Sequence, residues 1–255
     1  MRFLPMEFSF FGFRKACRVI FFSASVLAVF LGLAVTARTA PLPERTIIIT
    51  IDDGPKIYFE RFLDFFNQEQ VPATFFVMCW RLNDTETGVK MRELLLSAHN
   101  EGHEIENHTY GHGRFGIYLE KKGKNWVLND IERCSALIKE VTGMRPVILR
   151  PPHWDIPEWF RAELVQNKGY IVQARDSSVI SAKERVPRDV DTGDYAFHEG
   201  YLKNPGEATA KLLKRTQALI KKREAEGVKV HVLVFHELPL ALDALKALIP
   251  EWKSG

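Results

Sequence analysis

Side chains that can bind metal or move protons stand directly after short apolar segments of this 255-residue chain. Short apolar runs bounded by turn residues predict buried parallel strands. The carboxyl ends of such strands lie along one edge of a sheet or barrel, and ligands bind there. We therefore expect these side chains to meet in one site, and their convergence is more informative than any one motif. They are Asp52, Asp53, His108, His112, Arg150, Asp176 and His236.

The histidine pair is the first candidate metal-binding element. His108 and His112 are four positions apart, and one helical turn of this length would let both rings face one ion. Taken alone, the spacing more often marks two surface histidines, and Gly111 and Gly113 disfavour a regular helix. A nearby carboxylate would complete a three-ligand face that leaves metal positions open for water and substrate.

The adjacent carboxylates Asp52 and Asp53 can divide two tasks. Neighbours beyond a strand end point in different directions, so one carboxylate can bind metal while the other acts as a base. The alternative is an Asx-type turn before Gly54-Pro55 that has no chemical role.

The elements that must position these residues alternate between strand and helix. This alternation predicts an α/β fold with a parallel sheet or barrel, and the pattern does not separate the two. Residues 177–205, rich in charge, Gly and Pro, are expected to form a long loop. Strands are expected at 46–51, 73–77, 103–107, 147–149, 170–173 and 228–235, and helices at 58–68, 91–100, 125–142, 158–167 and 207–225.

Residues 1–40 predict a targeting segment. Three basic residues precede an apolar run at 19–35, and small residues allow cleavage after Ala37. The run is also close to the length of about 20 residues that spans a bilayer, so an uncleaved signal anchor is the alternative. In both cases residues 41–255 are expected to form one exported domain, periplasmic, secreted or held at the outer face of the cytoplasmic membrane.

Composition limits the other partners. The net charge is +3, and the basic residues are dispersed, with no basic patch beside exposed aromatics, so no nucleic-acid partner is expected. Cys79 and Cys134 either form one disulfide or remain free thiols. Trp80, Trp126 and Trp159 are expected to pack in the core or at a groove edge rather than on sugars.

Several segments resemble the NodB-type polysaccharide deacetylases, carbohydrate esterase family four. Residues 50–55 (Thr-Ile-Asp-Asp-Gly-Pro) resemble the family's first signature, and 108–112 (His-Thr-Tyr-Gly-His) its second. Residues 150–152 resemble the start of its third signature, 234–236 its last, and 73–77 its second strand. The matches follow family order, and the first two together are highly specific.

The resemblance implies a single-domain, distorted (β/α) barrel that hydrolyses N-acetyl groups of an extracytoplasmic glycan, with metal-bound water as the nucleophile. Peptidoglycan, a chitin-like polymer or an exopolysaccharide would be the substrate. A divalent metal, zinc first and cobalt or nickel as alternatives, would be bound by Asp53, His108 and His112. Asp52 would be the general base and His236 the general acid.

The resemblance further implies that Arg150 holds Asp52. The third signature departs from the family pattern, because His153-Trp154 replaces an aromatic residue and Gly. Pro152, His153 and Trp154 are therefore expected to form a reshaped wall of the substrate groove.

The fourth signature, Asp-x-x-Asp-Trp, is matched best at Asp176, where the second Asp and the Trp are missing. That second carboxylate ordinarily supports the catalytic histidine. Its loss leaves the tuning of His236 open, with Glu237, Asp189 and Asp191 as substitutes.

Two other functions compete with this interpretation. A different amide hydrolase on the same scaffold, such as a deformylase, would need a closed pocket instead of a long cleft. A non-catalytic glycan-binding module would need neither the metal ligands nor the base.

Overall fold

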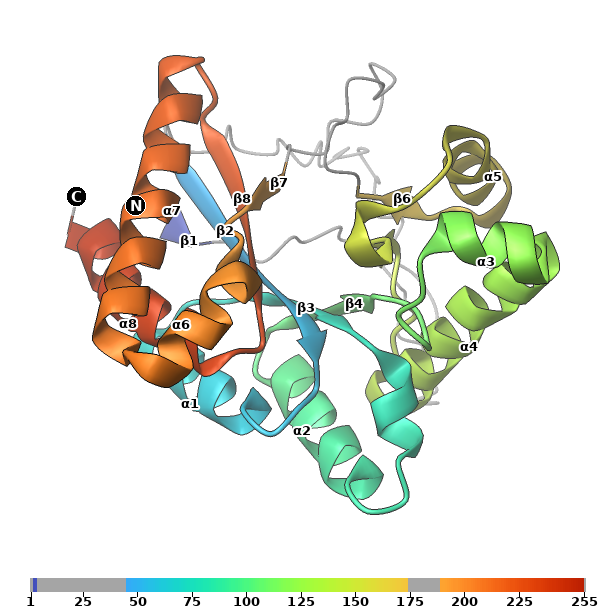
Figure 1. Ribbon diagram of the computed structural model, residues 1–255. Helices are drawn as coiled ribbons and strands as arrows, with labels where there is room; N and C mark the ends of the chain where they lie inside the picture. The colour runs from blue at the N-terminus through green and yellow to red at the C-terminus, as the bar shows by residue number, and fades with distance from the viewer. Residues whose placement is uncertain (1, 4–44, 174–188, 255) are drawn as a thin grey trace, which may run out of the picture.

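A computed structural model describes residues 2–3, 45–173 and 189–254. Its strands lie at the centre of the molecule and its helices surround them (Figure 1). The sheet order is β6-β5-β4-β3-β2-β8-β7, β1 pairs with β2, and every pairing is parallel. The strands are β1 (Arg2–Phe3), β2 (Thr46–Gly54), β3 (Thr74–Val77), β4 (Glu104–Asn107), β5 (Ile148–Leu149), β6 (Ile171–Val172), β7 (Asp189–Asp191) and β8 (Val230–His236).

The predicted α/β class is confirmed, and the seven-stranded path curls into a half-barrel within one domain. The predicted strands and helices are all present, with ends shifted by at most a few residues. The helices are α1 (Phe59–Glu69), η1 (Cys79–Asn83), α2 (Gly88–Asn100), α3 (Phe115–Lys122), α4 (Lys124–Thr142), η2 (Pro152–Trp154), α5 (Glu158–Lys168), η3 (Asp194–Phe197), α6 (His198–Lys203), α7 (Pro205–Ala225) and α8 (Pro239–Ser254).

Strand β2 is the longest strand of the described sheet and lies inside it. All but one of its residues are buried, and it pairs with β3 on one side and β8 on the other. The register sets Asp52 opposite both Phe76 and His236. The first and last long strands therefore bring two chemically active residues to the same edge of the sheet.

The two faces of the sheet are covered differently. The largest apolar cluster joins the outer face to α1, α2, α7 and α8, and burial there stabilises the fold. A small cluster of Ile48, Phe76, Ile148 and Val232 fills the inner face. Side chains alternate along a strand, so Ile48, Thr50 and Asp52 share that inner face. The inner face thus changes from apolar to polar towards the carboxyl ends of the strands.

The prediction of a long loop at 177–205 is wrong in its second half, where β7, η3 and α6 lie. These elements are short and pack on neighbours distant in sequence, so local periodicity does not reveal them. Residues 174–188 lie outside the described ranges. Two helices were not predicted from the sequence. Helix α3 follows Gly111 and Gly113, and the apolar residues of α8 are almost fully buried.

No helix in residues 45–173 or 189–254 is long and apolar enough to cross a membrane. The predicted targeting segment falls almost entirely outside the described residues. Its existence and the boundary at residue 41 stay predictions.

Candidate active site

Asp52 is held by Arg150, which follows β5, three strands away from β2 in the sheet. Arg150 donates from Nη1 to Asp52 Oδ1 at 2.5 Å and to Thr50 Oγ1 at 2.8 Å. Arg150 is 1% exposed, and its guanidinium carbon lies 3.9 Å from the centre of the Phe76 ring. A buried carboxylate needs such a partner to remain charged. The predicted contact between Arg150 and Asp52 is therefore present, and it fixes the position of the carboxylate.

Asp53 turns away from its neighbour because its backbone leaves the strand conformation, with φ at 70°. Its Oδ1 lies 3.0 Å from His112 Nε2 and 3.5 Å from His108 Nε2. Burial alone would raise the pKa of the Asp53 carboxyl, but the neighbouring His108, His112 and Lys56 hold that pKa well below its usual value. The carboxylate is thus negative and faces two imidazoles.

The tautomer of His108 shows what these three residues are arranged to bind. Its Nδ1 lies 2.7 Å from the carbonyl oxygen of Arg150, so Nδ1 carries the proton and donates it. An imidazole with its one proton on Nδ1 directs the Nε2 lone pair towards Asp53, whose Oδ1 is buried without a hydrogen-bond partner among the described residues. Two facing lone pairs require a cation or a proton between them.

A divalent ion fits this arrangement. The three candidate ligand atoms of Asp53, His108 and His112 lie within 4.8 Å of one another. Atoms bound at about 2.1 Å to one zinc ion in a tetrahedral site lie about 3.4 Å apart, close to the two measured separations. The bond from His108 Nδ1 to a backbone carbonyl is the usual way to orient a histidine ligand. The predicted ligand set is brought together, and the identity of its metal stays a prediction.

The histidine pair does not lie on a helix, contrary to the one-turn spacing considered from the sequence. Thr109 and His112 have φ values of 70° and 56°, so residues 108–112 form a loop. The Thr109 hydroxyl accepts a hydrogen bond from His112 N at 2.9 Å and closes this loop. Convergence comes from loop geometry, because glycines at 111 and 113 disfavour a helix.

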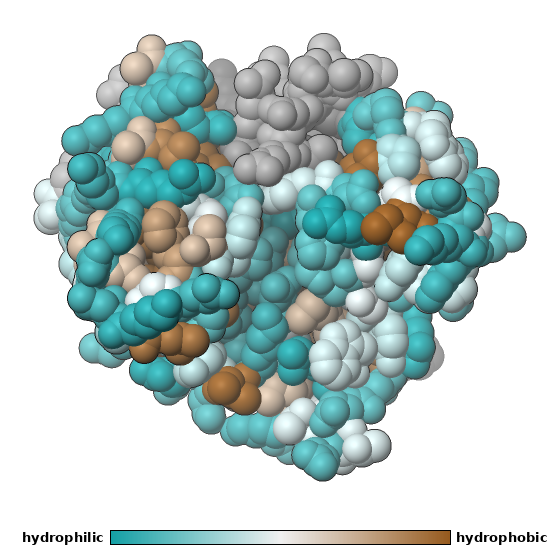
Figure 2. Space-filling model, in the orientation of Figure 1, coloured by the Kyte–Doolittle hydropathy of each residue, from teal (hydrophilic) through white to brown (hydrophobic). Residues whose placement is uncertain are grey.

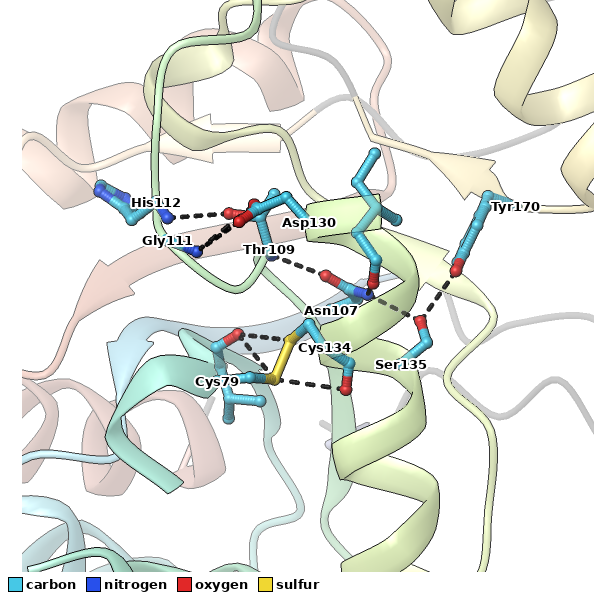
Figure 3. The surroundings of a disulfide bond; sticks show 11 residues. Cys79, Asn107, Thr109, Gly111, His112, Asp130, Cys134, Ser135 and Tyr170 are labelled. Carbon is cyan, nitrogen blue, oxygen red and sulfur yellow. Dashed lines mark hydrogen bonds between the residues drawn. A yellow bond between two sulfur atoms is a disulfide. The ribbon is translucent and has the colours of Figure 1, made fainter. Parts of the chain in front are cut away.

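Helix α4 and a disulfide support the loop from behind (Figure 3). Asp130 of α4 accepts a hydrogen bond from Gly111 N, at 3.2 Å and 3.3 Å to its two oxygens. Cys79 forms a disulfide with Cys134 of α4, which decides between the alternatives left open by the sequence. The backbone N–H groups of Cys79 and Trp80 donate to the carbonyls of residues 109 and 110. The loop is therefore held between η1 and α4.

His236 is the last residue of β8 and lies beside Asp52. It is held by Asp194, which was not predicted as a site residue. Asp194 of η3 accepts from His236 N and lies against His236 Nδ1, both at 2.7 Å. Burial lowers the pKa of His236, but the charge and hydrogen bond of Asp194 outweigh it and raise the pKa to about 9. Tyr195 stands edge-on to the His236 ring, with centroids 5.3 Å apart. His236 is thus positioned as a protonated imidazole.

A sequence profile of the polysaccharide deacetylase family matches residues 39–171, just over half of the chain. The chain belongs to the polysaccharide deacetylase family. A peptidoglycan-N-acetylglucosamine deacetylase of Bacillus cereus is 32% identical over 123 residues, covering 48% of this chain and 41% of that protein. The putative polysaccharide deacetylase YheN of Bacillus subtilis is 23% identical over 212 residues, covering 82% of this chain and 64% of that protein. The matches thus span less than two thirds of these relatives.

Solved structures show the same fold. The polysaccharide deacetylase Bc1974 from Bacillus cereus has a TM-score of 0.64 at 20% identity, with 82% of this chain and 88% of that chain covered. A carbohydrate esterase family four pseudoenzyme from Bacillus anthracis has a TM-score of 0.58 at 16% identity, with 84% and 62% covered. Because a pseudoenzyme shares the deacetylase fold, the fold alone does not decide activity, and the residues of the site must be considered.

A second segment also carries the spacing of the fourth deacetylase signature. Residues 191–195 read Asp-Thr-Gly-Asp-Tyr, so the Asp-x-x-Asp-aromatic spacing is present with Tyr195 in place of Trp. Asp194 is the second Asp of this spacing, and it holds His236, as the second carboxylate of the signature ordinarily does. The spacing from Asp191 to Tyr195 could have revealed it from the sequence. Asp176 lies outside the described residues. Glu237 does not replace Asp194, because its carboxylate accepts from Lys56 N and Tyr58 N at 2.6 Å and 3.0 Å.

The third deacetylase signature lies beside the candidate metal ligands. His153 and Trp154 have φ values of 57° and 59°, which turn the chain sharply after Pro152. The His153 ring centre is 4.8 Å from that of His112, and the Trp154 ring centre lies 5.4 Å from the Arg150 guanidinium carbon. Pro152 is buried. The three residues predicted to contact substrate thus border the site, and their contact with substrate stays a prediction.

Proposed function

We propose that this chain is a metal-dependent N-deacetylase of an extracytoplasmic, N-acetylated glycan. One observation carries the proposal: Asp53, His108 and His112 converge around one point, and Asp52 is held separately beside them by Arg150. A binding module needs sugar contacts, but it does not need a buried, charged base next to three metal ligands. Membership of the polysaccharide deacetylase family supports the same reaction class.

A divalent cation held by Asp53, His108 and His112 would polarise the acetamide carbonyl and lower the pKa of a bound water molecule towards neutrality. Asp52 accepts the proton of the attacking water, and Arg150 keeps the carboxylate oriented. His236 donates a proton to the departing amine, which is a poor leaving group as an anion. Asp194 holds His236 at Nδ1, so Nε2 is the donating atom.

The surface around the site suits a polymer. Strand β2 ends near the centre of Figure 1, and in the same view Figure 2 shows a hollow of hydrophilic residues at the centre of this face. A small linear amide would instead need a closed pocket. The relatives are named for peptidoglycan and chitin, which are both N-acetylated glycans. We propose one of these classes, or an exopolysaccharide, as substrate.

The deciding experiment is acetate release by the purified full-length chain, first made metal-free and then titrated with zinc, cobalt and nickel. The substrate panel contains peptidoglycan, chitin oligomers and a formylated small amide. Metal-dependent release of acetate from a glycan is the expected result. Tight metal binding without any release would instead support a binding-only protein, as the fold's occurrence in a pseudoenzyme illustrates.

We also propose that the domain acts outside the cytoplasm. The basic and apolar segment within residues 1–40 supports export, and a disulfide between Cys79 and Cys134 suits an oxidising compartment. Cell fractionation with N-terminal sequencing of the mature protein tests this. A mature chain that begins after Ala37 indicates a cleaved signal, a membrane-bound intact chain indicates an anchor, and an intact cytosolic chain contradicts export.

A further inference from the structure

A cavity lies beside the loop that carries the candidate histidine ligands. Its volume is about 270 Å³, and it is bounded by this loop, α3 and α4. Gly111 belongs to its wall and precedes His112 directly, so the cavity and the candidate metal site share one short stretch of chain. Its lining residues are Tyr110, Gly111, Tyr118, Lys122, Trp126, Asn129, Asp130 and Arg133.

Aromatic rings form part of the cavity wall. Tyr118 and Trp126 stand edge to face with centroids 4.9 Å apart, and Trp126 is 37% exposed although tryptophan is highly buried on average. Tyr118 is seated against the chain at Gly113, where a Cβ atom would come within 1.6 Å of its ring. The glycine after His112 therefore allows this aromatic wall to lie directly against the histidine loop.

The cavity also carries excess positive charge. Lys122 Nζ lies 4.0 Å from the centre of the Trp126 ring, and Arg133 Cζ lies 3.5 Å from that of Tyr110. Neither cation forms an ion pair with a carboxylate of the described residues. The one carboxylate in the lining is Asp130, which accepts hydrogen bonds from Gly111 N. The lining thus holds two cations, Lys122 and Arg133, and one carboxylate, Asp130, whose oxygens already accept from a backbone N–H.

We propose that this cavity is a subsite for a sugar residue that carries a carboxylate. The C–H faces of a pyranose ring pack against aromatic rings, whose faces are electron-rich. A carboxylate on that sugar would accept charge-assisted hydrogen bonds from Lys122 and Arg133. The inference rests on the proposed function, because the acidic sugar is proposed to neighbour, in the same glycan, the residue whose acetyl group is hydrolysed.

The test compares two disaccharides that differ in one carboxylate. The first is N-acetylglucosaminyl-N-acetylmuramic acid, which has a lactyl carboxylate, and the second is neutral chitobiose. Binding to the full-length zinc-loaded chain is measured by calorimetry on the Asp52→Asn background, so turnover does not interfere. The wild-type cavity is expected to favour the acidic disaccharide, and Lys122→Gln to weaken its binding by about tenfold without changing that of chitobiose.

Matched controls use neighbouring residues outside the cavity. Lys121→Gln removes the same charge one residue earlier, and Trp159→Ala removes an exposed tryptophan of α5; both are expected to leave binding unchanged. Trp126→Ala is expected to weaken both disaccharides, because the ring contacts the sugar and not the carboxylate. Thermal melting of each variant separates loss of binding from loss of folding.

Two outcomes overturn the inference: equal binding of both disaccharides by the Asp52→Asn chain with an unaltered cavity, or the same loss of acidic binding in Lys121→Gln as in Lys122→Gln. Failure of the proposed function looks different. In that case the wild-type chain releases no acetate from any glycan. Binding of the acidic disaccharide still depends on Lys122, and the subsite stands.

Discussion

Asp52 and Asp53 are neighbours in the chain but contact different kinds of side chain in this site. Asp52 is bound to a buried guanidinium, whereas Asp53 faces two imidazoles, because a left-handed backbone conformation turns the second side chain away from the first. Arg150 holds the Asp52 carboxylate close to the candidate metal ligands without making it one of them. This separation is the physical basis for assigning base and ligand roles to chain neighbours.

Replacing each aspartate should therefore have a different effect. Asp52→Asn is expected to lower kcat by about 10²- to 10⁴-fold and to keep zinc affinity near that of the wild type. Asp53→Ala is expected to lower zinc affinity by at least about a hundredfold, more than loss of an outer partner would. Kinetics and a competing chelator measure the two quantities, and melting curves check folding because Arg150 loses its anion in Asp52→Asn. Full activity of Asp52→Asn would disprove the base assignment.

Asp194 should control the pH profile through His236. The pKa of His236 is raised to about 9, so the proposed acid keeps its proton at lower pH and loses it as pH rises through that value. Stability from the same pair is complete below the ordinary histidine pKa and is lost over the same rise. Asp194→Asn removes the negative charge, so the alkaline limb of kcat is expected to move to lower pH.

The control for this pH profile is Asp191→Asn. Its carboxylate accepts from Gly193 N at 2.9 Å, and it is three residues before Asp194 in the same signature. Its alkaline limb should match that of the wild type. An unchanged limb in Asp194→Asn would mean that the limb reports another group.

At the scale of elements, the disulfide stabilises the fold and the metal loop together. It closes a separation of 55 residues between η1 and α4, the two elements that hold residues 108–112. Cys79→Ala combined with Cys134→Ala is expected to lower the free energy of unfolding by about 4 kcal/mol in the chain-entropy account. Zinc affinity should fall in the same variant, because η1 and α4 are no longer joined.

Urea unfolding and zinc competition measure these two effects, with Cys17→Ser as the control that leaves the pair intact. If zinc affinity stayed unchanged while stability fell, the disulfide would act on the fold alone. Both readouts are needed, since a destabilised chain can still bind zinc tightly once folded.

The elements also show what the sequence predicts well. Strand β2 and helix α1 follow from apolar patterns and turn residues, and the site residues at the ends of β2 and β4 follow from their place after those patterns. Strand β7 has three residues and η3 four, too few for periodicity to identify. Asp194 was therefore missed, although its spacing from Asp191 and Tyr195 was visible. Trp126 was expected to pack in the core or at a groove edge; it is 37% exposed and lines the cavity between α3 and α4.

For the whole molecule, bound metal should stabilise the fold. A ligand that binds only the folded state at one hundred times its Kd adds about 2.7 kcal/mol. For a domain of this size each kcal/mol raises Tm by about 2–4 °C, so zinc is expected to raise Tm by about 5–10 °C over the metal-free chain. Scanning calorimetry with and without zinc measures this shift. His108→Ala should lose it, while His99→Ala, an exchange on the surface of α2, should retain it.

The pairing of β2 with β8 sets the order in which the site is completed. Asp52 and its neighbour across the sheet, His236, are 184 residues apart in the chain. Contacts of such high sequence separation form late in folding, because a long loop must close first. The loop that carries the two candidate histidine ligands can therefore form before the proposed base and the proposed acid stand side by side. Docking of β8 on β2 is thus the folding step that completes the proposed catalytic pair.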